Sequence, residues 1–293
     1  MSGVIMNGRV VPVPGIDVQN YLENPKLAIK VPEDGYVSTE NWRARNVTLH
    51  TTKGIPGGKD QRPQVLHPGL GPDTNVGERS AAYCRNNPDT GRSRHGGHHL
   101  TFDGNGRLYC HMDLIRVVGY HGGPCNRYSI GIEIWQDKKT AGLWEGQCDA
   151  VVMFLDWLTR SVVCLDGRPA PIQRQVHFPY LGRPISRLGP RANGRNVVGI
   201  YGHRDADSNR GQGDPGDFVF ERLIRAGYER FNFGASEDLA AWERRQGELF
   251  GVTPNGQGEF NDARVDGVAG PGTAERLTKS GRRHGLWVAR AGD

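Results

Sequence analysis

Residues 195–216 read RNVVGIYGHRDADSNRGQGDPG. The segment opens with an apolar run rich in β-branched residues, Val197–Tyr201, which predicts a buried strand. His203 stands where that strand ends, and the polar loop after it stops at Asp214, directly before a Pro-Gly pair. An aspartate before proline is typical of a helix start, with the carboxylate as N-cap and proline at the first helical position. Histidine and aspartate are also metal ligands, so both interpretations stay open at this point.

The rest of the chain shows a mixture of strand and helix patterns. Short runs rich in β-formers, a hairpin around the turn Asp103–Gly106, and apolar residues at three- and four-residue steps can all be recognised. The predicted strands are 46–50, 98–102, 107–112, 128–135 and 195–202, and the predicted helices are 76–86, 145–165 and 215–226. This pattern predicts an α/β domain with a mixed central β-sheet flanked by helices.

Changes in composition divide the 293 residues into three parts. Residues 1–45 are polar and rich in turn formers, and we expect an irregular lead-in there. Residues 46–234 hold the α/β domain. Residues 236–293 begin with a helical pattern and continue through a Gly/Asn-rich loop, which predicts a small C-terminal helical module. Within the domain, Asp166–Arg195 predicts an unusually long Arg-rich loop that is a candidate for contact with substrate.

Composition also limits the partners. The net charge of +5 suits an anionic polymer such as nucleic acid or bacterial cell wall. The basic residues are scattered, without a Lys/Arg block or an aromatic ladder, so we expect no nucleic acid. No apolar run is long enough for a membrane span. The first residues lack a basic region followed by an apolar one, so we expect no Sec signal peptide, and synthesis in the cytoplasm.

The five cysteines favour no structural metal site. Their number is odd, and no two of them form a C-x-x-C pair, which argues against a zinc ribbon. We expect free thiols, and a bridge between Cys110 and Cys125 is the alternative.

Two histidines, His50 and His203, end predicted strands, and Asp214 closes the loop after the second. Strand ends converge on one rim of a sheet, where three such residues can share a metal ion. Two imidazoles and one carboxylate leave a fourth tetrahedral position open, which is the pattern of catalytic zinc. Glu133 is the single charge in the strand SIGIEI. Burial of a carboxyl raises its pKa and suits it to proton transfer near neutral pH.

Each of these residues also has an ordinary interpretation. A histidine at a strand end can simply lie at the surface, Asp214 can be a helix cap, and Glu133 can face solvent. No spacing is as tight as H-E-x-x-H, so the residues alone indicate a metal hydrolase and nothing finer.

Four motifs in order add a family resemblance. They are NVTLHTT (46–52), GGHHLTFDGNGRLYCHMDL (96–114), GYHGGPCNRYSIGIEIW (119–135) and GIYGHRDADSNRGQGDPGDF (199–218). Together they resemble the type-2 N-acetylmuramoyl-L-alanine amidases, a family that includes phage lysozyme-type amidases and peptidoglycan recognition proteins. The resemblance spans residues 46–226. It implies a zinc-centred mixed α/β fold and cleavage of the amide between N-acetylmuramic acid and L-alanine.

The resemblance also implies roles for individual residues. His50, His203 and Asp214 match the three zinc ligands, and Glu133 matches the acid/base residue. His121, in GYHGG, is a candidate substrate or transition-state contact, and we expect Asn126 to bind substrate with it.

Two positions depart from the family pattern. Many catalytic members have a lysine two residues before the third ligand, where this chain has Gln212. An amide can donate to an oxyanion but brings no charge, so Arg210 or Arg204 becomes the candidate for charged contact with the substrate. Where phage members carry a tyrosine before the hairpin, this chain has His98, which we expect to act near the metal unless it is a surface histidine.

The tail adds a second wall-directed motif. VDGVAGPGTAERL (265–277) resembles the core of a helical peptidoglycan-binding domain, and its alternative is a Gly-rich linker. The sequence therefore predicts a zinc amidase whose partner is peptidoglycan. A recognition protein that binds without cutting, and a zinc hydrolase of another amide, are the alternatives. Action on the wall would follow phage lysis, as in an endolysin, or specialised secretion, as in an antibacterial effector with delivery machinery or an immunity protein. A recycling enzyme is a further possibility, against which the tail argues.

Overall fold

The computed structural model describes residues 2–31, 46–52, 65–86, 97–122, 126, 129–137, 142–161, 172–177, 199–206 and 214–231. Within them, no helix combines the length and apolar character needed to cross a membrane. Gln212, Arg210, Cys125, Cys164 and the whole C-terminal module lie outside the described residues, so the predictions made for them stay predictions.

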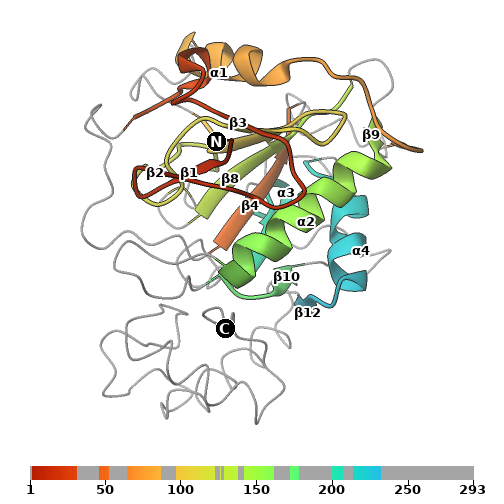
Figure 1. Cartoon of the computed structure of the whole chain (residues 1–293). Coiled ribbons are helices and arrows are strands. Elements are labelled where there is room, and N and C mark those ends of the chain that lie inside the picture. Colours follow the sequence, from red (N-terminus) through yellow and green to blue (C-terminus); the bar gives the residue numbers. More distant parts are fainter. Residues whose placement is uncertain are drawn as a thin grey trace, which may run out of the picture.

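The centre of the structure is a mixed β-sheet whose described strands run in the order β12-β10-β11-β4-β8-β6-β7-β3 (Figure 1). Neighbouring strands from β12 to β6 are parallel, and β6 and β7 form the antiparallel hairpin. The strands are β3 (Val18–Asn20), β4 (Asn46–Thr51), β6 (Leu100–Phe102), β7 (Leu108–Cys110), β8 (Ser129–Ile134), β10 (Gln175–His177), β11 (Gly199–Gly202) and β12 (Glu229–Phe231). This mixed sheet with flanking helices confirms the predicted fold class.

The alternating sequence of the central strands gives the sheet one apolar and one polar face. In β8, Ile130, Ile132 and Ile134 are fully buried in the hydrophobic core, and they alternate with Ser129, Gly131 and Glu133. Successive side chains of a strand point to opposite faces. The parallel register sets His50 of β4 opposite Glu133 and Thr101 of β6 on its other side. The polar face therefore carries a row of polar side chains, His50, Glu133 and Thr101, across three strands.

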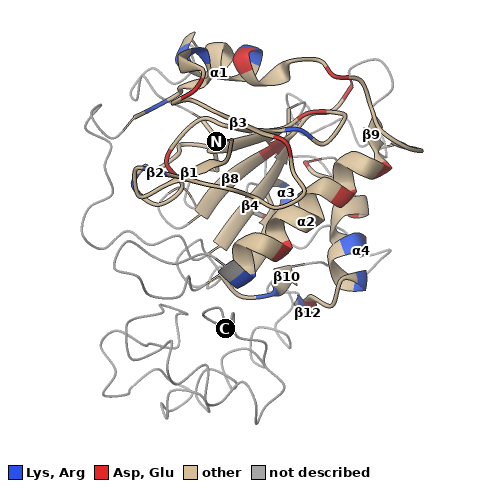
Figure 2. Cartoon of the chain, in the orientation of Figure 1, with Lys and Arg blue, Asp and Glu red and all other residues tan. Residues whose placement is uncertain are grey.

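Helices cover both faces of the sheet. α2 (Glu145–Ser161) packs on the apolar face, where Phe154 contacts Phe102 edge to face with ring centroids 5.9 Å apart. α4 (Asp217–Arg225) lies beside α2, and its Arg222 Nε is 2.9 Å from Asp149 Oδ1 of α2. Figure 2 shows the two helices next to each other, with acidic residues along α2 and basic residues on α4. α1 (Val76–Asn86) packs against β6 and brings Ser80 to the polar face.

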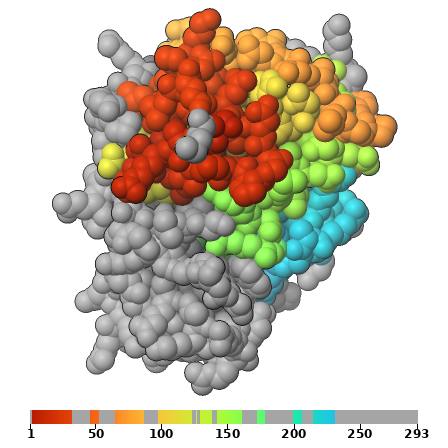
Figure 3. All heavy atoms as spheres, viewed as in Figure 1, coloured from red at the N-terminus to blue at the C-terminus, as the bar shows by residue number. Residues whose placement is uncertain are grey.

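The N-terminal segment is more ordered than predicted. It forms the antiparallel pair β1 (Val4–Met6) and β2 (Arg9–Val11), the edge strand β3, and the 3₁₀ helix η1 (Pro25–Leu27). The expected irregular conformation is therefore wrong for these four elements, while the residues between them form turns and irregular backbone. Val4 and Ile5 are fully buried, and the segment spreads over one face of the molecule (red in Figure 3). Three-residue strands between turns leave too short an alternation for sequence patterns to detect.

Four further expectations need correction. The long loop Asp166–Arg195 contains β10, which holds only one apolar residue and so gave no strand signal. β5 (Val65–His67) and β9 (Gly142–Trp144) form a small parallel pair that was not predicted. α4 begins at Asp217 with Gly216 as its N-cap, so the cap interpretation of Asp214 is wrong. Cys110 is free, which excludes its bridge to Cys125; Cys84 and Cys148 are also free, as expected.

Candidate metal centre and active site

The three predicted ligands meet at the carboxyl ends of neighbouring parallel strands. Leu49 of β4 is paired with Gly202 of β11, so the next residues, His50 and His203, are level with each other. In parallel sheets, residues at the carboxyl ends of adjacent strands share one rim, which is the usual place for a site. His203 is the first residue of the short helix α3 (His203–Ala206), directly after β11. The sheet register alone therefore brings the two histidines together.

The ligand atoms face one another inside the protein. His50 Nδ1 is 2.8 Å from His203 Nδ1, and His203 Nδ1 is 3.2 Å from Asp214 Oδ2. All three residues are buried, and one candidate ligand atom from each lies within 4.8 Å of the others. The Thr51 backbone N–H donates to Asp214 Oδ1 over 2.9 Å, which leaves the second carboxylate oxygen turned to the histidines. Asp214 is thus placed as the predicted third ligand.

The donor set fits a zinc ion. Zinc bonds of about 2.0–2.1 Å in a tetrahedral arrangement place neighbouring ligand atoms about 3.3 Å apart. The nitrogen–oxygen separation of 3.2 Å already matches this value, and the two nitrogens, 2.8 Å apart, would need to separate by about 0.5 Å. Two nitrogens and one oxygen also leave the fourth position open, as catalytic zinc requires. We therefore regard this cluster as a metal site suited to zinc.

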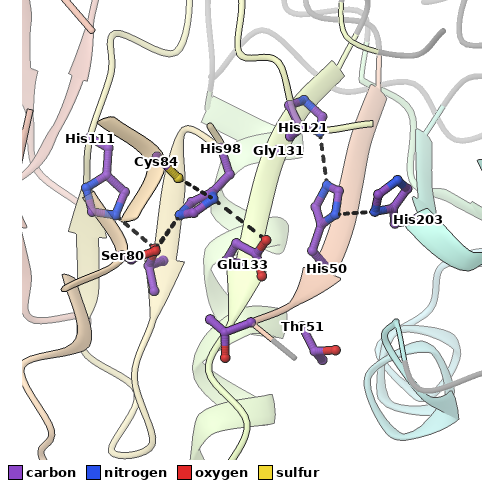
Figure 4. A network of polar contacts seen from close by, with 12 residues as sticks. His50, Thr51, Ser80, Cys84, His98, His111, His121, Gly131, Glu133 and His203 are labelled. Carbon is purple, nitrogen blue, oxygen red and sulfur yellow. Dashed lines mark hydrogen bonds and ion pairs between the residues drawn. The ribbon is translucent and has the colours of Figure 1, made fainter. Parts of the chain in front are cut away.

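His121 determines which nitrogen of His50 faces the cluster. His121 Nε2 lies 3.2 Å from the Ser129 carbonyl oxygen, and its Nδ1 lies 3.0 Å from His50 Nε2 (Figure 4). Burial lowers the pKa of His121 to about 3, so the ring is neutral near pH 7. The Ser129 hydroxyl lies 3.4 Å from the same His121 Nε2. The carbonyl is the nearer partner and only accepts, so we assign the His121 proton to Nε2, and its Nδ1 accepts from His50 Nε2–H. The lone pair of His50 is then on Nδ1, which faces His203.

Asn126 holds the loop that carries His121. Its side-chain oxygen accepts from the backbone N–H of His121 over 2.8 Å and from that of Gly122 over 2.6 Å. His121 and Asn126, the two predicted substrate contacts, therefore lie behind His50. His121 contacts the His50 ring, and Asn126 contacts the backbone of the loop that carries His121.

Glu133 and His98 lie next to each other on the polar face of the sheet, beside the ligand cluster. The Glu133 side chain is 18% exposed, and its Oε1 is 3.7 Å from His98 Nδ1 (Figure 4). His98 is buried beside α1, and its Nε2 lies 2.8 Å from Thr101 Oγ1 and 3.0 Å from Ser80 Oγ. The structure therefore puts His98 next to the candidate acid/base residue, and its burial contradicts the alternative of a surface histidine.

A backbone carbonyl also sets the proton position of His98. His111 Nδ1 donates to the Leu27 carbonyl over 2.8 Å, so its Nε2 accepts from the Thr101 hydroxyl, also over 2.8 Å. Thr101 must then accept from His98 Nε2–H, which turns the lone pair of His98 Nδ1 toward Glu133. Burial lowers the pKa of His111 to about 4 and that of His98 well below its usual value, so both rings are neutral near pH 7.

Arg204 points into the core and not toward the site. Its side chain is 3% exposed, with Nη1 2.7 Å from Asp217 Oδ1 and the guanidinium over the Phe220 ring. Its Nε is 3.7 Å from Asp205, a residue whose burial raises the pKa to about 7. The predicted substrate contact is therefore replaced by a structural role, because β11 ends one residue before His203 and the helical turn of α3 directs Arg204 inward.

Several residues of the site were missed by sequence reasoning. Thr51 follows His50 directly but acts through its backbone, which no side-chain motif reveals. Thr101 had a usable signal, since it occupies the polar position of a short alternating strand that runs beside Glu133. Ser80, Ser129 and His111 carried no signal, because their partners lie on other elements.

Comparison with known proteins places the chain. The family model Amidase_2, described as N-acetylmuramoyl-L-alanine amidase, matches residues 42–217, which include the ligand cluster and Glu133. No curated protein matches the chain.

Similar solved structures are peptidoglycan recognition proteins. The ectodomain complex of PGRP-LCa and PGRP-LCx bound to tracheal cytotoxin is 16% identical, with a TM-score of 0.42, and the match covers 73% of this chain and 98% of that one. For a cysteine-to-serine mutant of Drosophila PGRP-LB the values are 15%, 0.40, 72% and 98%. The family match covers more than half of the chain and agrees with the resemblance predicted from the motifs. The chain belongs to the Amidase_2 family of N-acetylmuramoyl-L-alanine amidases.

Proposed function

We propose that this protein is a zinc-dependent peptidoglycan amidase that hydrolyses the amide between N-acetylmuramic acid and the L-alanine of the stem peptide. The observation that supports this most is the polar row itself. His50 and Glu133 are register partners on neighbouring parallel strands, and His50 Nδ1 joins His203 and Asp214 in a buried set of facing ligand atoms. Membership of the amidase family supplies the substrate class.

Each residue of the metal centre and its neighbour Glu133 has a defined task in this reaction. His50, His203 and Asp214 would hold the zinc, which supplies Lewis acidity for activating water and polarising a carbonyl near neutral pH. Glu133 takes a proton from the attacking water and delivers it to the leaving nitrogen. The C–N bond breaks, the acyl carbon keeps the water oxygen as a carboxylic acid, and the L-alanine amino group is freed. The neutral His98, whose Nδ1 is 3.7 Å from Glu133 Oε1, lies beside the carboxyl while that proton is held.

The test combines one substrate with one matched pair of variants. Purified sacculi are incubated with the zinc-loaded protein, and the soluble products are analysed by mass spectrometry. We expect stem peptides with a free L-alanine amino terminus. Glu133→Gln should lower the rate by about 10²–10⁴-fold while zinc stays bound, since general acid–base catalysis contributes that much. Glu221→Gln, on the outer side of α4, is the matched control and should cut normally.

Two outcomes would contradict the proposal. Sacculi that bind the protein but release no peptides would support a recognition protein instead. Products cleaved at another amide would support a different specificity. We also propose that the protein acts on the cell wall after phage lysis or specialised secretion, with residues 236–293 binding the wall. Deleting those residues should weaken binding to sacculi but spare cleavage of soluble muropeptides.

A further inference from the structure

We propose that His121 is a positioning residue for the metal centre, which fixes the tautomer and the ring orientation of His50 before zinc binds. This inference rests on the zinc site of the proposed function, but it concerns binding of the metal and not the bond that is cut. It is a different role from the substrate contact that the sequence suggested for His121.

The hydrogen bonds run in one direction from a fixed point. The Ser129 carbonyl belongs to β8, so its position is set by the sheet. It accepts from His121 Nε2–H over 3.2 Å, and His121 Nδ1 then accepts from His50 Nε2–H over 3.0 Å. Ligating histidines typically donate their second N–H to such a partner, and the loss of that partner lowers metal affinity by about 10–100-fold. Here the partner is a second histidine whose own proton is assigned by the backbone.

The surroundings of His121 hold the ring in place. Gly131 lies beneath it on the polar face of β8, and a Cβ at that position would be 2.4 Å from His121 Cγ. Asn126 fixes the backbone at His121 from the other side, through the two N–H groups that donate to its side-chain oxygen. The ring therefore fills the space that a glycine leaves open, and its plane stands at 89° to that of His50. Such a closely packed ring can hold the side chain of His50 in one orientation.

The proposal predicts a specific loss and a specific rescue. His121→Ala removes the acceptor, so His50 can adopt the other tautomer or turn its ring, and we expect zinc affinity to fall by about 10–100-fold. In His121→Asn, the side-chain oxygen can stand where Nδ1 stood and accept from His50, which should restore part of the affinity. His67→Asn changes a partly buried histidine that packs on Trp144 of β9, and it should leave affinity unchanged.

The experiment measures the zinc dissociation constant by competition with a chromophoric chelator, without substrate. ¹⁵N NMR of the imidazoles in the metal-free wild type provides a second measurement that needs no variant. We expect His50 and His121 both to carry their protons on Nε2.

Equal zinc affinity in wild type and His121→Ala, or the opposite tautomer of either ring, would overturn the proposal. Absence of zinc binding by the wild type would overturn both this inference and the proposed function. Zinc binding with normal His121 dependence but no cleavage of sacculi would refute the amidase alone.

Discussion

Replacing Gly131 with alanine tests whether the His121 ring is as closely fitted as the geometry indicates. Gly131 is in the middle of β8, with no positive φ, so alanine is compatible with its backbone. The added methyl would meet three atoms of His121, namely Cγ at 2.4 Å, Cδ2 at 2.5 Å and Nδ1 at 2.8 Å. All three nearest atoms belong to one side chain, so the strain of Gly131→Ala should fall on His121.

The size of the effect follows from these distances. Ordinary contact begins near 3.4 Å, so the ring must retreat by about 1.0 Å from the methyl. Overpacking of this kind costs about 1–3 kcal/mol of the free energy of unfolding. A shift of about 1 Å also stretches the 3.0 Å contact with His50 toward 4 Å, beyond hydrogen-bond range. Zinc affinity should therefore fall about as much as in His121→Ala.

A double-mutant cycle separates this from a general disturbance of the strand. In Gly131→Ala combined with His121→Ala, the three clashing atoms are absent and the methyl occupies space that the ring has left. The double variant should be at least as stable as His121→Ala alone, with a coupling energy of about 1–3 kcal/mol. Urea unfolding of the metal-free proteins measures all four corners. Additive losses would show that the ring is not what Gly131 accommodates, and would refute the reasoning.

Three further predictions concern protonation, the core and the metal. Burial lowers the pKa of His111 to about 4 in the folded protein, whereas its pKa is about 6.5 in the unfolded chain. Below pH 6.5 the unfolded chain therefore binds a proton that the folded protein does not, and the free energy of unfolding falls. The stability advantage of wild type over His111→Asn in urea unfolding should shrink by about 2 kcal/mol from pH 7 to pH 5, and a constant advantage would contradict the assignment. Arg204→Met should lower the free energy of unfolding by about 2 kcal/mol, which is less than for a fully buried pair because Asp217 is 45% exposed. It should leave KM for muropeptides unchanged, and a raised KM would show that Arg204 contacts the substrate. Zinc at 100 times its dissociation constant should stabilise the protein by about 2.7 kcal/mol, seen as a drop in melting temperature on adding chelator; an unchanged melting temperature would argue against a bound metal.

The sequence was sufficient for those parts of the fold whose signals are local. Alternation in SIGIEI and NVTLHT separates the apolar from the polar face, and the spacing in Glu145–Ser161 defines α2. The short strands of the N-terminal segment and β10 were missed, because three residues carry too little periodicity. Their pairing depends on tertiary contacts, as when β3 joins the edge of the sheet beside β7.

For the site, the sequence identified the ligand types but not the direction of each side chain. His50, His203 and Asp214 were found because they stand at strand ends and a loop end, which topology brings to one rim. The sequence did not reveal the protein partners of His121, Asn126 and Arg204, since polar residues near a motif point to a neighbouring side chain or to the core depending on single turns of backbone. Such directions follow from packing and cannot be read from residue type.

The two carbonyl-anchored histidine chains give the site a common design. Ser129 O orients His121 and through it His50, while Leu27 O orients His111 and through Thr101 the ring of His98. Carbonyl oxygens can only accept, so each chain favours one arrangement of protons on its buried rings. One chain ends in a lone pair turned to the metal ligands and the other in a lone pair turned to Glu133. In the proposed amidase, folding of the sheet would set both before zinc or substrate binds, and this preorganisation would reduce the rearrangement that catalysis needs.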